Sequence, residues 1–175
     1  MKFILECDEM DGLVFIDKSY LAELNSDMLY AMDILLDPFG KSELVFDFSN
    51  ETWENVRSRE TKQIREFCGH GKMIIWLFDG MKKECKIEKG DEITDYAKWL
   101  HIPTGKLLAV TASELIQCLS YPELEMEKIF ELEVEDGWYA IWNNEIDKIM
   151  YCKKEKPNSI PSNIQEMYEK IKGEL

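Results

Sequence analysis

The spacing of apolar and polar residues predicts several amphipathic helices in this chain. Early in the chain, apolar residues recur at steps of three and four, as on one face of a helix, at Leu21, Leu24, Met28, Ala31 and Leu35. Beyond Asn50, whose side chain can cap a helix, a second helix is predicted with an apolar face formed by Trp53, Val56, Ile64 and Phe67. Residues 113–119 predict a third helix, and the capping-box pair Ser162 and Gln165 begins a fourth.

Short runs of apolar and β-branched residues predict the strands. The run Met73–Phe78 is continuously apolar, too short for a typical helix and followed by Asp-Gly, so we expect a central strand covered on both faces. Residues 82–89 are its expected hairpin partner. Residues 3–7 and 13–16 flank an Asp-Gly pair, which predicts an opening hairpin. Residues 44–48 also have the composition of a strand.

Beyond Pro103, the pattern predicts a buried strand at residues 106–111 that runs into the third helix. Three strand-like runs then follow, separated by Asp-Gly and Asn-Asn-Glu, and predict an antiparallel meander over residues 128–135, 138–143 and 146–152. These elements predict an α+β fold, in which a largely antiparallel sheet has three or four flanking helices. We expect a single globular domain over residues 1–175.

Composition and charge narrow the classes of function. The chain has 175 residues, of which 45% are hydrophobic, and this is enough to bury one core. Its 35 acidic side chains outnumber 21 basic ones, and the net charge of -14 repels nucleic-acid phosphates and anionic lipid. Nucleic acid and membranes are therefore not expected as partners, whereas the same field attracts a basic protein.

Neither an export signal nor a membrane span is predicted. The N-terminal apolar run Phe3–Leu5 is much shorter than the apolar region of a secretory signal. No stretch of about 18 apolar residues occurs elsewhere. The five cysteines are scattered and odd in number, so we expect reduced thiols and a cytoplasmic location.

Residues suited to catalysis or metal binding are few. Histidine occurs only at His70 and His101, and no nearby cysteine or histidine pair completes four zinc ligands, so we predict no catalytic residue, no metal and no cofactor. The alternative is a metal-dependent hydrolase or nuclease that uses Asp79, Glu84 and Lys86. In such an enzyme the carboxylates hold a divalent ion and the lysine orients water, but the spacing here is shorter than usual.

The most informative segment alternates acidic with apolar residues. On a strand, Glu131, Glu133 and Glu135 would stand in a row about 7 Å apart, while the apolar residues between them face the core. Such a row is either the solvated face of an antiparallel sheet or a contact for Lys and Arg side chains of a basic partner. In the second case we expect Asp136 to join the contact and Trp138 to act as an aromatic anchor.

A strand, a polar turn and a Gly-x-Tyr hairpin occur in three stretches, Gly105–Glu114, Phe130–Leu132 and Asp136–Tyr139. These stretches are similar to parts of bacterial toxin-immunity and nuclease-inhibitor proteins, the competence nuclease inhibitor among them. The resemblance implies a small acidic cytoplasmic protein that neutralises a basic toxin or nuclease by covering its active site. With the shortage of catalytic residues it favours a stoichiometric, immunity-type inhibitor, and a homodimeric structural or regulatory module stays as a further alternative.

Overall fold

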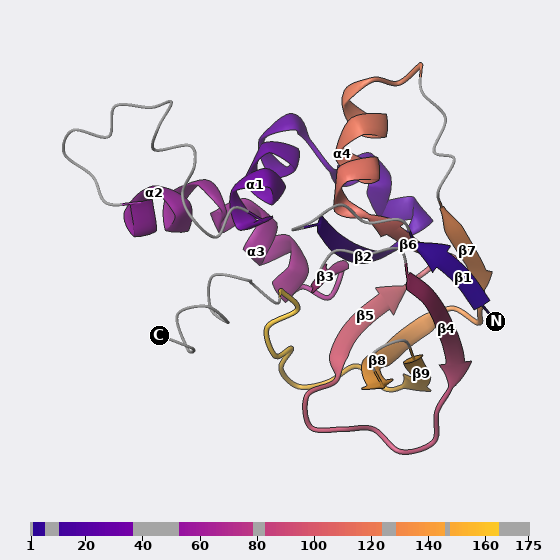
Figure 1. Ribbon diagram of the computed structural model, residues 1–175. Coiled ribbons are helices and arrows are strands. Elements are labelled where there is room, and N and C mark those ends of the chain that lie inside the picture. The colour runs from indigo at the N-terminus through magenta and orange to yellow at the C-terminus, as the bar shows by residue number, and fades with distance from the viewer. Residues whose placement is uncertain are drawn as a thin grey trace.

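The computed structural model describes residues 2–5, 11–36, 53–78, 83–123, 129–145 and 148–164. They form two β-sheets, four α-helices and one 3-10 helix, arranged as sheet, sheet and helical layer (Figure 1). The fold is a single α+β domain with largely antiparallel sheets, which confirms the predicted fold class.

The first sheet has five strands in the order β1-β4-β9-β8-β5. Their bounds are β1 Lys2–Leu5, β4 Lys83–Lys89, β5 Lys98–Ile102, β8 Gly137–Glu145 and β9 Lys148–Lys154. Neighbouring strands are antiparallel except β4 and β9, which are parallel. The second sheet is wholly antiparallel, in the order β3-β2-β6-β7. Its bounds are β2 Asp11–Asp17, β3 Met73–Phe78, β6 Lys106–Thr111 and β7 Phe130–Glu133.

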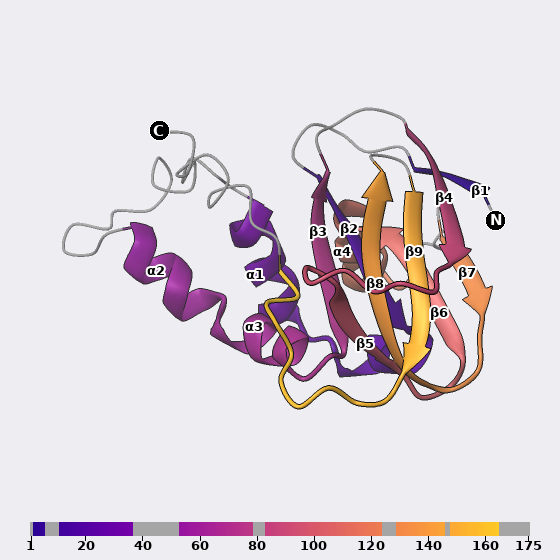
Figure 2. The same cartoon turned by 90° about the horizontal axis from the view of Figure 1, so that it is seen from below.

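The two sheets face each other across the main hydrophobic core, and Figure 2 shows β8 and β9 in front of β2 and β6. Because side chains alternate between the faces of a strand, every second residue enters this core. The second sheet contributes Leu13, Phe15, Ile74, Leu107, Ala109 and Leu132. The first sheet contributes Ile87, Leu100, Ile102, Tyr139, Ile141, Ile149 and Tyr151.

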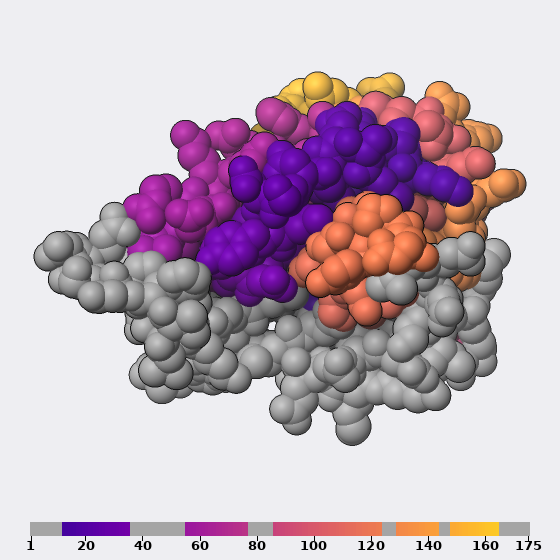
Figure 3. Space-filling model, turned by 90° about the horizontal axis from the view of Figure 1, so that it is seen from above, coloured from indigo at the N-terminus to yellow at the C-terminus, as the bar shows by residue number. Residues whose placement is uncertain are grey.

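A layer of helices encloses a second core on the outer face of the second sheet. The bounds of the helices are η1 Lys18–Glu23, α1 Ser26–Leu36, α2 Trp53–Glu60, α3 Lys62–Gly69 and α4 Ala112–Ser120. Helices η1, α1, α3 and α4 cover this outer face, while α2 packs against α1 and α3. The apolar faces of α1, α3 and α4 meet the outward side chains of the sheet, among them Val14, Ile16, Ile75, Leu108 and Val110. In Figure 3, α1 and α4 lie side by side over this layer.

Polar side chains divide two of the predicted helices. The side chain of Asn25 accepts a hydrogen bond from the N–H of Met28 and caps α1, so the preceding residues form the separate helix η1. The second predicted helix is divided between α2 and α3 at the buried Thr61, whose hydroxyl donates to the carbonyl of Arg57. The strand at residues 106–111 and the helix after it form as predicted.

Strand pairing differs from the predicted hairpins. The opening hairpin is wrong, because β1 pairs with β4 in the first sheet while β2 pairs with β3 and β6 in the second. The predicted pairing of residues 82–89 with β3 is also wrong, since β4 pairs with β1 and β9. Both connections pass from one sheet to the other, so neighbours in sequence do not become neighbours in a sheet.

Two further expectations are partly wrong. The run Met73–Ile75 is fully buried as predicted, but β3 lies at an edge of its sheet, where a bridge between Ile75 and Ile164 covers it. Of the predicted meander, β8 and β9 form a hairpin, but β7 pairs with β6 in the other sheet.

Some expectations fall outside the described residues. The predicted strand at residues 44–48 and the part of the terminal helix from Gln165 onward belong to this group. The beginning of that helix is wrong, because Ile164 forms a bridge with Ile75 instead of a helical turn. Within the described ranges, no helix has both the length and the apolar character needed to cross a membrane.

Candidate functional site

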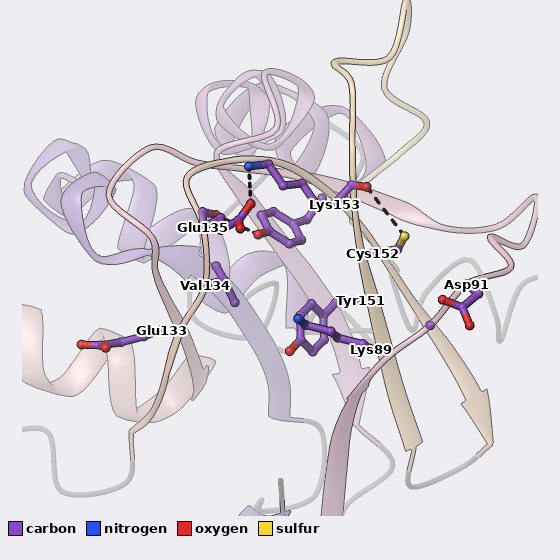
Figure 4. A pocket seen from close by; sticks show the side chains of 10 residues that line it. Lys89, Asp91, Glu133, Val134, Glu135, Tyr151, Cys152 and Lys153 are labelled. Carbon is purple, nitrogen blue, oxygen red and sulfur yellow. Dashed lines mark hydrogen bonds and ion pairs between the residues drawn. The ribbon is translucent and has the colours of Figure 1, made fainter.

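The sandwich is closed at one seam and open at the other. At the closed seam β3 and β5 are in contact, and the N–H of His101 donates to the carbonyl of Gly71 over 2.7 Å. At the open seam, the end of β7 stands apart from β4 and β9, and a pocket of about 650 Å³ lies between them (Figure 4). Small-molecule sites in proteins have volumes of about 300–1,000 Å³, so this pocket is large enough for an organic ligand.

The pocket continues the inner face of the first sheet. Lys89 is the register partner of Tyr151, and Lys153 is the register partner of Tyr139. Register partners project on the same face of a sheet, and both tyrosines belong to the main core, so both lysines also occupy inward positions. Deeper in the sandwich the same face carries Ile87, Ile141 and Ile149. The inner face therefore changes from aliphatic to aromatic and cationic at its open end.

Two tyrosines form the floor of the pocket. Their ring centroids are 6.2 Å apart, and Val134, which directly follows β7 of the other sheet, also lines the pocket. The hydroxyl of Tyr139 donates to the carbonyl of Glu135 over 2.8 Å. Burial raises the pKa of Tyr139 to about 12, and the negative charge of Glu135 adds to the shift. Burial also raises the pKa of Tyr151, whose hydroxyl forms no hydrogen bond with any described residue.

Charged groups surround the mouth of the pocket. The Nζ atom of Lys153 lies 3.0 Å from the carboxylate of Glu135. The hydrogen bond and positive charge of Lys153 lower the pKa of Glu135, and the charge of Lys89 lowers it further. Lys89 itself forms no ion pair within the described part of the chain. Figure 4 shows that the carboxylates of Glu133 and Asp91 point away from the centre of the pocket.

Two glycines shape the walls. The N–H of Val134 donates to the carbonyl of Gly105 over 2.8 Å, and a Cβ atom at Gly105 would lie 2.4 Å from the carbonyl oxygen of Val134. Only glycine allows this approach, which holds the β7 wall in place. At Gly90, a Cβ atom would lie 2.6 Å from the ring of Trp142, so glycine allows the chain to pass close to this ring directly after β4.

No protein-family model and no curated protein matches the chain. A solved structure described as "Crocagin biosynthetic gene J" is similar at 14% sequence identity and a TM-score of 0.43. The similarity covers 87% of this chain and 96% of that one. A likeness this distant carries no argument about function.

The acidic residues singled out from the sequence do not act as one row. The alternation on β7 is as predicted, because Leu132 enters the main core while Glu131 and Glu133 are exposed. Glu135 lies beyond the end of the strand and is paired with Lys153 across the open seam. The carboxylate of Glu131 lies 3.3 Å from the Nζ atom of Lys18. Two of the three carboxylates are therefore neutralised by lysines of the same chain.

The other two predicted contact residues differ from each other. Asp136 is exposed and, like Glu133, forms no ion pair with a described residue. Trp138 is half-buried, and its ring stacks on His101 with centroids 4.9 Å apart. The Nδ1 atom of His101 is 2.6 Å from the hydroxyl of Tyr20, so Trp138 belongs to an aromatic cluster within the chain.

Most of the predicted hydrolase site falls outside the described structure. Asp79 and the side chain of Glu84 lie outside the described residues, and Lys86 is exposed on β4. In the described ranges no three His, Cys, Asp or Glu side chains gather where a metal ion could be held. The thiol of Cys68 is buried, and burial raises its pKa, which opposes use as a nucleophile.

Apart from Glu133 and Glu135, the pocket residues were missed by the sequence analysis. The signal for them was a period of two that continues from core positions into lysine, as in Ile87-x-Lys89 and Ile149-x-Tyr151-x-Lys153. A lysine at an inward position of a strand marks a place where the core opens to solvent.

Proposed function

We propose that this protein works by binding, without catalysis, and that it holds a small organic molecule in the pocket at the open seam. The observation that carries this proposal is the floor of two tyrosines, in which the ring of Tyr151 is buried but its hydroxyl has no partner among the described residues. A polar group in this position, next to an apolar wall, is the usual composition of a ligand site.

Three features support binding at this place. The pocket joins both sheets, so its walls are held by strands on two sides. Its floor combines aromatic surface with hydroxyl groups that orient a ligand. Its charged lining residues, Lys89, Asp91, Glu133, Glu135 and Lys153, surround this floor and offer polar contacts to a ligand. Cytoplasmic residence is part of the proposal and is supported by Cys68 and Cys152, which form no disulfide within the described part of the chain.

The test is a screen of small organic molecules against the full chain by ligand-observed NMR, followed by a pocket-filling variant. Val134→Phe places a larger side chain in the pocket, and we expect it to abolish binding of the molecules found. Ile116→Phe is the matched control, because it enlarges a half-buried side chain in the helical layer instead. Molecules that bind equally to both variants, or a screen that finds none, would overturn the proposal.

A basic protein is the second candidate ligand, as an immunity-type inhibitor would require. The observation in its favour is that Glu133 and Asp136 are exposed and unpaired among the described residues, in a chain of net charge -14. Their two charges lie where the chain leaves β7, close to the mouth of the pocket.

This candidate is tested by the rate of association with a purified basic partner recovered from the source cells. Glu133→Lys with Asp136→Lys should slow association at least tenfold at low salt. Glu92→Lys with Asp95→Lys is the control of equal net charge, located on the loop after β4. Equal slowing by both pairs would show that only the overall charge matters and would remove this surface as the contact.

A further inference from the structure

We propose that the ligand of the pocket is an organic anion, a carboxylate attached to a flat aromatic body. This inference rests on the proposed function, since it names the class of molecule that the same pocket takes. It arises from the charges that project into the pocket, from the free phenol of Tyr151 and from the shape of the floor.

The inward charges leave a surplus of one positive charge. Two ammonium groups, those of Lys89 and Lys153, occupy inner-face positions at the open end of the sheet. One carboxylate, that of Glu135, faces them and is paired with Lys153 at 3.0 Å. The carboxylates of Glu133 and Asp91 point elsewhere (Figure 4). A ligand with one negative charge would pair with the remaining ammonium group, that of Lys89.

The phenol of Tyr151 supplies a second hydrogen-bond donor beside the ammonium group of Lys89. Tyr151 and Lys89 are register partners on the parallel strands β9 and β4, so their side chains leave the sheet next to each other. Burial raises the pKa of Tyr151, so the phenol keeps its proton at neutral pH and can donate it in a hydrogen bond. An ammonium group and a hydroxyl on adjacent strands match the two oxygens of one carboxylate.

The remaining surface suits a flat ring. The two tyrosine rings are tilted by 44° to each other, and Val134 lines the same pocket. Aromatic rings prefer tilted or offset contacts of this kind over stacking in register. The hydroxyl of Tyr139 is already used by the carbonyl of Glu135, so its ring offers mainly apolar surface. A ligand ring that packs on these tyrosine faces can direct the ligand's carboxylate toward Lys89.

The experiment compares three probes that share one ring, indole-3-acetate, indole-3-acetamide and tryptamine, by isothermal titration with the full chain. We expect the anion to bind at least tenfold more tightly than the neutral amide, and the cation to bind most weakly. Lys89→Met should weaken the anion about tenfold and Tyr151→Phe about threefold, with little effect on the amide. Lys86→Met is the matched control, because it removes the same charge from an exposed position on the same strand outside the pocket.

The outcomes separate this inference from the proposed function. If the amide or tryptamine binds as well as indole-3-acetate, or if Lys89→Met and Lys86→Met act alike, the anion assignment is wrong while the pocket remains a ligand site. If none of the probes binds but the screen finds molecules blocked by Val134→Phe, the assignment is again wrong and the proposed function stands. A failure of both experiments overturns both. A peptide ending in tryptophan, compared with its C-terminal amide, distinguishes a chain terminus from a free acid as the source of the carboxylate.

Discussion

The side-chain amide of Asn163 binds the backbone of Trp99 as a neighbouring strand would. Its oxygen accepts from the N–H of Trp99 at 3.2 Å, and its nitrogen donates to the carbonyl of Trp99 at 2.7 Å. The same nitrogen approaches the carbonyls of Cys68 and Met73. The backbone carbonyl of Asn163 accepts from the N–H of Ile75. One buried side chain thus joins α3, β3 and β5 and closes the seam opposite the pocket.

Replacement of Asn163 should destabilise the fold strongly. Asn163→Ala leaves buried carbonyl groups of three segments without their donor, and we expect a loss of about 2–4 kcal/mol in the free energy of unfolding. Urea denaturation followed by circular dichroism measures this loss. Asn158→Ala is the control, because Asn158 is an exposed asparagine of the same segment, and it should change stability by less than about 0.5 kcal/mol. Similar midpoints for the two variants would contradict the role given to Asn163.

A methyl group at Gly105 should disturb both the fold and the pocket. The residue has φ 72°, and its added Cβ would lie 2.4 Å from the carbonyl oxygen of Val134. Gly105→Ala therefore combines backbone strain with a clash, and we expect it to cost about 2–4 kcal/mol and to weaken any pocket ligand by moving the β7 wall. Gly69→Ala is the control, since nothing lies within 4 Å of its added Cβ. Unfolding curves for both variants, with ligand titration, would show whether the wall has moved.

Local patterns predicted the elements better than their partners. Met73–Phe78 and Lys106–Thr111 are recognisable because a run of apolar residues determines burial within a few neighbours. Their places in the sheets depend on contacts far along the chain, such as the pairing of Ile75 with Ile164. The assumption that adjacent strands form hairpins fails wherever a connection passes between the two sheets.

The same distinction explains the outcome for the site. The alternation of Glu131 and Glu133 with core residues follows from the period of a strand and was predictable. The partner of Glu131 is Lys18, which is 113 residues away in sequence, and no local pattern indicates such a pair. The acidic pattern of the sequence therefore did not indicate which of these carboxylates are paired with lysines of the same chain.

Stability in acid should depend on Asp17, which is fully buried at the start of η1. Burial alone would raise its pKa, but hydrogen bonds from Ser19 and Thr104 outweigh burial, and the pKa lies below the ordinary value of 3.8. A carboxyl group with a lowered folded-state pKa stabilises the fold above its unfolded pKa. This stabilisation is lost as the pH falls from the unfolded pKa through the folded one.

Asp17→Asn should accordingly lower the free energy of unfolding at neutral pH. It should also reduce the amount by which that free energy falls between neutral and acid pH. Thr104→Val removes one donor to Asp17 and should have the same effect in weaker form. The measurement is the free energy of unfolding from urea titrations at several pH values. A variant Asp17→Asn that keeps the full acid dependence of the parent chain would show that other carboxyl groups are responsible.

Alkaline titration should reveal the floor of the pocket. Burial raises the pKa of Tyr139 to about 12, from an ordinary value of 10.0. A group whose folded pKa is raised stabilises the fold below its unfolded pKa, and this stabilisation is lost as the pH rises from about 10 to about 12. The absorbance of tyrosinate should therefore show a late phase that Tyr139→Phe diminishes, while Tyr121→Phe, which alters an exposed ring, leaves that phase in place. Tyr139→Phe also removes the hydrogen bond to the carbonyl of Glu135, which should lower the free energy of unfolding by about 1 kcal/mol at neutral pH. Burial also raises the pKa of Tyr151, so a smaller late phase can remain in Tyr139→Phe. A late phase of undiminished amplitude in Tyr139→Phe would contradict the raised pKa of Tyr139 and would show that its ring is more open to water than its geometry indicates.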